Sequence, residues 1–403
     1  MGEFRFTTAG ESHGKGLVTM VEGVVAGLPL EAAYINKELK RRQAGYGRGP
    51  RMEIEKDEAE IISGVRYGLT MGSPIALFIP NRDWQNWQEI MSVVPVEKEA
   101  EPITHPRPGH ADLAGVTKYN LKDIRPIMER ASARETAARV AAGAIARRFL
   151  QEFGIVIHSH TLAVGEYCLE GVSTIDWGQV EASPLRCADA GLEREMMAAI
   201  DKARADGDTL GGVFELIAIG VPVGLGSHVG WERRLDGRIA QAIMSINAVK
   251  GVEIGSGFAM ARLKGSQAHD IIEPNPSLAT AENEATRQSL PWRHASNRAG
   301  GIEGGMSNGE EIIIRAVVKP IATLANPLPS IDLRSGEIAG AHCERSDVCV
   351  VPAAGVIGEA MLAIILADAC LEKFGGDNLN ETLTNYHNYL DRILLGENEQ
   401  PHS

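Results

Sequence analysis

The chain has few cysteines and few aromatic residues: its 403 residues include five Cys and only 5% Phe, Trp and Tyr together. The cysteines are Cys168, Cys187, Cys343, Cys349 and Cys370, an odd number with no Cys-x-x-Cys pair. That pattern argues against a disulfide framework and a structural zinc site, and it favours a reducing, cytoplasmic environment. A His-Glu-x-x-His sequence is missing as well, so we predict no metal site.

The chain also lacks an excess of basic residues, because 53 Asp and Glu outnumber 40 Lys and Arg. Its formal charge of −13 repels nucleic acid and anionic lipid, so any anionic ligand requires a local cluster of cations. No long apolar run precedes Glu11 and His13, and we therefore expect no secretory signal. The most apolar stretch, 348–371, is interrupted by Pro352, Glu359 and Asp368, which favours a buried helix over a membrane span.

The residues that are present suit a large folded core, since 44% are hydrophobic and 23% are charged. The length alone allows two or three domains or one large α/β domain. No internal repeat, low-complexity tract or Ser/Gly linker marks a boundary, so we prefer a single domain over 1–403. Patterning predicts helices over 129–150, 192–205, 238–250 and about 358–373, and strands over 75–79, 212–219 and 312–318. Regular βαβ alternation is absent, which favours a layered α/β or α+β architecture.

Two histidines lie in short Gly-containing loops. Residues 10–14 (GESHG) place His13 beside a hydroxyl and a carboxylate, and residues 107–112 (RPGHAD) place His110 two residues before Asp112. A side chain that titrates near neutral pH can protonate a leaving group, and Asp112 could fix the tautomer of His110. The alternative is that each is a loop histidine bonded to its neighbours.

Cations gather in two segments of this acidic chain. Residues 40–51 contain five Lys and Arg, a pattern typical either of an anion clamp or of a solvated basic face. In residues 129–136, Arg130 and Arg134 stand one helical turn apart, where they could converge on one anion or make surface ion pairs. Two further segments are less specific. Residues 300–309 are Gly-rich without matching a P-loop or a Rossmann fingerprint, and residues 345–347 (RSD) precede the last apolar helix.

Taken together, these segments resemble the chorismate synthase family. Residues 10–14 with Glu22 and Gly23, residues 129–136, and residues 345–349 resemble its three signature segments, in the same order and across nearly the whole chain. The linking pieces 45–49, 107–112, 246–251 and 299–305 are similar to the family as well. The resemblance implies an α+β fold built as a β-α-β sandwich, with helices layered between sheets, and assembly as a homotetramer.

The resemblance also implies an activity: a 1,4-elimination that converts 5-enolpyruvylshikimate 3-phosphate into chorismate and phosphate. The reaction needs reduced FMN but has no net redox change. By the same resemblance, His13 would protonate the departing phosphate, His110 would face the N1 side of the flavin, and Asp347 would lie near flavin N5 and assist loss of the C6 proton. A flavin brings chemistry that a carboxylate base alone cannot supply.

Substrate and flavin carry several negative charges, and their burial requires cations. The resemblance assigns this role to Arg42, Arg48 and Arg134. The residues implied to contact the flavin are Arg130, Ala131, Ser132, Asn247, Ala248, Gly304, Lys319, Pro320, Ile321, Ala322, Thr323 and Arg345. One departure is that some members carry two hydroxyl residues in the segment 319–323, whereas this chain offers only Thr323. Backbone N–H groups would then bind the flavin phosphate there.

Two other functions stay open at this point. A redox flavoenzyme would share the FMN site but oxidise its substrate, and a non-enzymatic anion- or RNA-binding protein could use the cations of 40–51. The sequence also leaves open whether the chain reduces its flavin with NADPH or depends on an external flavin reductase.

Overall fold

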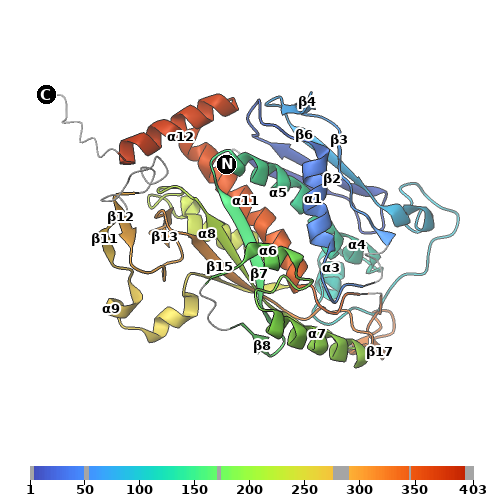
Figure 1. The fold of residues 1–403 in the computed structure, drawn as a ribbon. Helices are drawn as coiled ribbons and strands as arrows, with labels where there is room; N and C mark the ends of the chain where they lie inside the picture. The colour runs from blue at the N-terminus through green and yellow to red at the C-terminus, as the bar shows by residue number, and fades with distance from the viewer. Residues whose placement is uncertain (1–3, 50–53, 170–173, 276–289, 345, 395–403) are drawn as a thin grey trace.

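Two antiparallel β-sheets flank a layer of helices in a computed structural model that describes residues 4–49, 54–169, 174–275, 290–344 and 346–394 (Figure 1). The four-stranded sheet has the order β1 (Arg5–Ala9), β2 (Gly16–Glu22), β6 (Ile75–Pro80), β3 (Glu60–Ile61). The five-stranded sheet has the order β10 (Val249–Ile254), β15 (Ile312–Val318), β9 (Gly212–Ile219), β7 (Val156–Val164), β8 (Tyr167–Cys168). Buried and exposed residues alternate along β2, so one face of its sheet packs on the core.

The helices between the sheets are α1 (Ala32–Gln43), α5 (Thr136–Gln151), α8 (Leu235–Met244) and α11 (Val351–Phe374). Helix α5 packs against β1 and β2, whereas α11 packs against β7 and β9 of the other sheet. The two helices also pack against each other, which closes the sheet–helix–sheet arrangement. The α+β fold with helices layered between sheets is therefore confirmed, and one connected cluster of buried residues spans both sheets.

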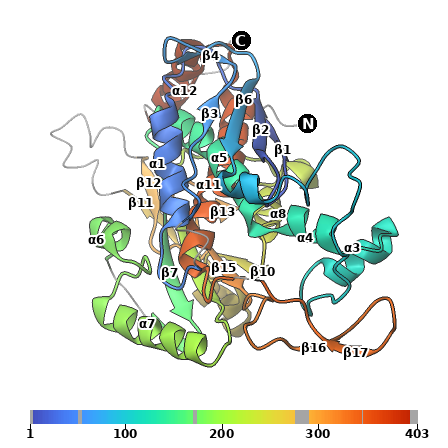
Figure 2. The same ribbon diagram turned by 90° about the vertical axis from the view of Figure 1, so that its right-hand side faces the viewer.

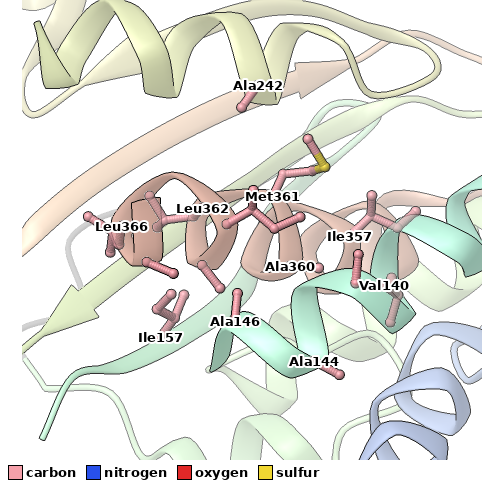
Figure 3. Packing of buried hydrophobic residues seen from close by; sticks show 14 of the residues in the cluster. Val140, Ala144, Ala146, Ile157, Ala242, Ile357, Ala360, Met361, Leu362 and Leu366 are labelled. Atoms are coloured by element: carbon pink, nitrogen blue, oxygen red, sulfur yellow. The ribbon is translucent and has the colours of Figure 1, made fainter. Parts of the chain in front are cut away.

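Small residues set the distance between α5 and α11. A Cβ atom added to Gly143 of α5 would lie 2.3 Å from the Cβ of Ala360 on α11, so the backbones meet without room for a side chain. Figure 3 shows Ala360 near α5, while Met361 extends from α11 towards Ala242 of α8. The Ala-rich composition of 129–150 thus serves close helix packing.

Helix α11 is long and apolar enough to cross a membrane by length and composition, but 94% of its most apolar window is buried inside the fold. It is the core helix expected from 348–371, although it begins at Val351 rather than near Gly358. The earlier start is possible because Pro352 occupies the first turn, where no backbone N–H is required.

Two other helix predictions are wrong at one boundary. The segment 129–150 is not one helix: α4 (Arg125–Ala131) ends at Ser132, a short 3₁₀ turn η2 (Ala133–Glu135) follows, and α5 begins there. Ser132 is extended and its hydroxyl accepts a hydrogen bond from the N–H of Arg134, as an N-cap does. The segment 238–250 leaves helix α8 at Met244, since its last residues pair with β15 as strand β10.

The remaining elements lie around this core. Strands β6, β9 and β15 and helix α7 (Ala190–Ala205) confirm the predicted strands and helix. Figure 2 shows α3 (Asp112–Tyr119) and the hairpin of β16 (Pro329–Ile331) and β17 (Ile338–Gly340) projecting on one side. There Leu333 packs against a small buried cluster of Ile103, Val116, Ile124 and Met128. The other described elements are α6 (Trp177–Ala182), α9 (Gly265–Ala268), α12 (Leu379–Leu394), β4 (Val65–Arg66), β5 (Leu69–Thr70), β11 (Ile272–Pro274), β12 (Trp292–His294), β13 (Ile302–Glu303) and β14 (Met306–Ser307), with the 3₁₀ turns η1 (Arg82–Asn86), η3 (Trp231–Arg233) and η4 (Gly257–Arg262).

Candidate active site

A cavity of about 400 Å³ collects side chains from segments far apart in the sequence. Its walls come from the β1–β2 loop, the end of α1, the 107–111 turn, the α4–α5 junction and the segments 246–248 and 319–323. The loop before α11 and the first turns of that helix complete it. The volume falls within the range of small-molecule sites, about 300–1,000 Å³.

His13 is held from two sides in this cavity. Its Nδ1 lies 2.8 Å from Oε1 of Glu129, and its backbone N–H donates to the other carboxylate oxygen at 2.7 Å. The imidazole stacks on Trp87 with ring centroids 3.8 Å apart. The side-chain amide of Asn81 donates to the carbonyl oxygens of residues 11, 12 and 14, so the loop itself is fixed. These contacts give the His13 ring a single orientation.

His110 is paired with a buried carboxylate as the sequence predicts. Its Nδ1 is hydrogen-bonded to Asp112, which also accepts bonds from the Arg107 backbone N–H and guanidinium at 2.8–3.1 Å. Burial would raise the pKa of Asp112, but the bonds from His110 and Arg107 outweigh burial and hold that pKa well below its usual range. Arg107 also donates to the hydroxyl of Thr323 at 3.0 Å.

Arg42 and Arg134 line the cavity from a buried ionic network. Nε of Arg42 donates to the hydroxyl of Thr136 at 2.9 Å, and one Nη approaches Asp57 at 3.4 Å. Burial lowers the pKa of Arg42, the charges of Arg48 and Arg134 lower it as well, and Asp57 opposes the change, with a net value of about 10. Arg134 pairs with Asp57 and donates to Asn81, while its buried Nη2 lies 3.7 Å from Oε2 of Glu55 and makes no hydrogen bond. A buried cationic N–H without a hydrogen-bond acceptor can donate to an anion.

Arg48 and Asp347 form a second ion pair in the cavity lining. Nε of Arg48 lies 3.6 Å from one carboxylate oxygen of Asp347, while the other accepts the backbone N–H of Gly49. The close approach depends on glycine, because a Cβ on Gly49 would lie 2.7 Å from the carbonyl oxygen of Ser346. The cluster 40–51 is thus divided: Arg42 and Arg48 face the cavity, whereas Arg41 pairs with Glu359, and Arg51 lies outside the described residues.

The expected flavin residues form the neighbouring wall. Asn247 donates to the carbonyl oxygen of Ala131 at 3.0 Å, and its buried Oδ1 has no hydrogen-bond partner. Burial lowers the pKa of Lys319, and so does the nearby charge of Lys250. Among the residues predicted for FMN, those lining the cavity are Ala131, Ser132, Asn247, Ala248, Lys319, Ile321, Ala322 and Thr323.

Three of the expected residues that the structure describes are not brought into the cavity lining. Arg130 is exposed and donates to the carbonyl oxygens of Thr8 and Gly10, because the break at Ser132 turns it away from Arg134. The prediction that the two arginines share one helical face is therefore wrong. Gly304 lies in the β13–β14 hairpin, and Pro320 is absent from the lining. Arg345 lies outside the described residues.

Three charged lining residues received no role from the sequence: Arg107, Glu129 and Glu344. Arg107 and Glu129 belong to the segments 107–112 and 129–136 that the sequence singled out, and this was the available signal. Glu344 carried no such signal. Burial raises the pKa of Glu344, but the hydrogen bond from His342 and the charges of Arg107 and His13 lower it overall.

The lining suits a multiply anionic ligand with a flat apolar part. Five cationic side chains, Arg42, Arg48, Arg107, Arg134 and Lys319, face three carboxylates, Glu129, Glu344 and Asp347. The floor is apolar and consists of Ile246, Val350, Ala353, Ala354 and Ile357. Among the described residues, no group of three or more His, Cys, Asp or Glu could hold a metal ion.

A family model, two relatives and a solved structure all point to one family. The model of one family, described as chorismate synthase, matches residues 4–371. The chorismate synthase of Moorella thermoacetica is 56% identical over 395 residues, which cover 96% of this chain and 100% of that protein. That of Solibacter usitatus is 53% identical and covers 96% and 99%. A crystal structure of a chorismate synthase superposes with a TM-score of 0.77 at 43% identity, over 97% of this chain and 98% of that chain.

Proposed function

Since this chain belongs to the chorismate synthase family, a family of lyases in the shikimate pathway, we propose that it converts 5-enolpyruvylshikimate 3-phosphate into chorismate and phosphate with reduced FMN. In this 1,4-elimination the C3–O bond to the phosphate breaks, a proton leaves C6, and a new ring double bond forms. The observation that carries the proposal is the convergence of His13, His110, Asp347 and three arginines on one cavity.

The cavity residues fit both anionic molecules. Arg42, Arg48 and Arg134 would bind the carboxylates and phosphate of the substrate, and Nη2 of Arg134, which makes no hydrogen bond within the fold, supports this role. Lys319, Thr323 and the backbone of 319–323 would hold the flavin phosphate. The hydroxyl of Thr323 accepts from Arg107, which leaves its own proton free to be donated. The unpaired Oδ1 of Asn247 is an acceptor for a ring N–H.

When bound, reduced FMN would supply the electron density that assists cleavage of the C–O bond. His13 would donate a proton from Nε2 to the departing phosphate, because its Nδ1 is occupied by Glu129. Asp347, held by Gly49 and Arg48, would assist removal of the C6 proton. His110, oriented by Asp112, would stabilise or protonate the N1 side of the flavin.

The test is anaerobic incubation of the chain with photoreduced FMN and 5-enolpyruvylshikimate 3-phosphate. We expect phosphate release and the diene absorbance of chorismate to rise together, while the reduced flavin is regenerated. Flavin absorbance that changes in proportion to product would indicate a redox flavoenzyme instead. The RNA-binding alternative requires binding that falls steeply with salt and ignores FMN.

We further propose a cytoplasmic homotetramer. Exposed apolar side chains such as Phe258, Ile271 and Ile272 support contact between copies. Sedimentation of the purified chain measures the assembly.

Adding NADPH and FMN without a separate reductase distinguishes intrinsic flavin reduction from dependence on an external flavin reductase.

A further inference from the structure

Glu129 is the one carboxylate of the candidate site that makes direct contact with His13. Its side chain is only 2% exposed, and both of its oxygens are used on His13, one by the ring and one by the backbone N–H. Its own carbonyl oxygen accepts the N–H of Ser12 at 3.1 Å. These three bonds join α4 to the β1–β2 loop across 116 residues of sequence. Glu129 therefore fixes both the loop and the ring.

The contact determines which nitrogen of His13 can act. An ionised carboxylate accepts hydrogen bonds but cannot donate, so Nδ1 of His13 must carry the hydrogen. Nε2 is then the atom that gains or releases a proton, as in other carboxylate–histidine pairs.

The environment of His13 differs from that of His110. Asp112 is shared between His110 and the guanidinium of Arg107, whose Nε lies 2.8 Å from it. The nearest cation to Glu129 besides His13 is Arg125, whose Nη1 is 3.9 Å away. The carboxylate of Glu129 therefore interacts mainly with one imidazole, that of His13. The other groups that face His13 are the indole of Trp87 and the charge of Glu344.

We propose that Glu129 is the positioning residue for His13, holding Nδ1 of the ring so that Nε2 is the nitrogen that donates to the departing phosphate. This inference rests on the proposed function. In the step, the Nε2–H bond breaks and the proton moves to a phosphate oxygen as the C–O bond breaks. His13 becomes neutral and regains its proton from solvent after product release. Both carboxylate oxygens of Glu129 are bonded to His13, so Glu129 acts through that residue.

The test is Glu129→Gln, which keeps the size of the side chain but removes its charge. The imidazole of His13 is followed by NMR in the chain without substrate, and its signal is identified by its loss in His13→Ala. An amide can either accept from Nδ1 or donate to it, so we expect the ring-nitrogen shifts to show a mixture of the two neutral tautomers in place of the Nδ1–H form alone. The kcat should fall, while KM stays unchanged.

Two further variants separate positioning from folding. Glu129→Asp retains a carboxylate that can only accept, and it should restore the Nδ1–H form and much of the turnover. Glu152→Gln removes a carboxylate that pairs with Arg148 at the C-terminal end of α5 and should leave the His13 tautomer and kcat unchanged. Lost turnover in Glu129→Gln with an unchanged His13 tautomer would overturn the inference. If the wild-type chain releases no phosphate but Glu129→Gln still changes the His13 tautomer, the positioning of His13 is supported and the proposed function is overturned.

Discussion

At the residue scale, the candidate site depends on pairs of a histidine and a buried carboxylate. His13 with Glu129 and His110 with Asp112 each have Nδ1 bonded to a carboxylate, and Nε2 of His110 also lies 3.4 Å from Nη2 of Arg107. An arrangement of this kind fixes the tautomer before a ligand arrives, and pre-orientation lowers the cost of reaching the transition state. The two histidines enter the cavity from separate loops, which allows each to be tested alone.

We expect His13→Ala and His110→Ala to bind FMN normally and to lose about 10²- to 10⁴-fold in turnover, the usual contribution of acid–base groups. Phosphate release under anaerobic conditions measures the turnover, and flavin fluorescence measures FMN binding. His228→Ala, an exposed histidine outside the cavity lining, is the control. Full turnover in both site variants would refute the acid–base assignment.

At the scale of elements, α5 and α11 are fixed by contact and by charge. Gly143 meets Ala360 without space for a side chain, and Glu359 of α11 is fully buried among three guanidinium groups. Arg41 comes from α1, Arg147 from α5 and Arg186 from the segment before α7. The same carboxylate also accepts the hydroxyl of Ser159 at 2.6 Å, so it joins β7 to the helices.

Gly143→Ala should lower the free energy of unfolding by about 1–3 kcal/mol, because the added methyl group forces α5 away from α11. Gly237→Ala is the matched control, since it is also a helical glycine but has no neighbouring atom closer than 4.0 Å to the added carbon. That variant should be neutral or stabilised by up to about 1 kcal/mol. Urea unfolding measures both, and equal effects would contradict the close contact.

Glu359→Gln should cost about 3–5 kcal/mol of unfolding free energy, because three buried cations lose their common anion. Glu372→Gln, which removes a partly exposed partner of Arg233 and Arg238, should cost no more than about 1 kcal/mol. Urea unfolding at neutral pH gives both values. A loss at Glu359 as small as that at Glu372 would show that the buried cluster adds little stability.

The same cluster predicts the response to acid. Burial raises the pKa of Glu181, but bonds from Arg186 and Arg41 outweigh burial and lower it from 4.5 to about 2. A carboxyl whose pKa is lower in the folded state stabilises the fold fully above about pH 4.5 and loses that effect as the pH falls towards 2. The unfolding free energy should therefore decrease over this range. The slope should be smaller in Glu181→Gln, and an unchanged slope would contradict the assignment.

Local pattern was enough to predict some elements and not others. Strands 212–219 and 312–318 are apolar and β-branched, and both occur as predicted. The break at Ser132 was missed because alanine-rich sequence favours a continuous helix. Tertiary contacts decide the break, because Arg134 must reach Asp57 and Asn81, which lie 77 and 53 residues away in sequence. The partner Glu129 of His13 was missed for the same reason.

At the scale of the whole molecule, the buried residues of both sheets and the central helices form one connected cluster. The single domain over 1–403 remains a prediction, and we expect it to unfold in one transition. Tryptophan fluorescence, with reporters at Trp84, Trp87, Trp177, Trp231 and Trp292, should follow the same urea curve as far-ultraviolet circular dichroism. Separate midpoints for the two probes would indicate two folding units.

The position of α11 in the chain has a consequence for biosynthesis. Both sheets are complete once residue 318 has been made, yet the helix that fills the space between them starts at Val351. A ribosome adds about 5–20 residues per second, so the apolar inner faces wait for several seconds without their partner. During that interval a nascent chain presents these faces to chaperones, and release before Phe374 would leave them permanently uncovered.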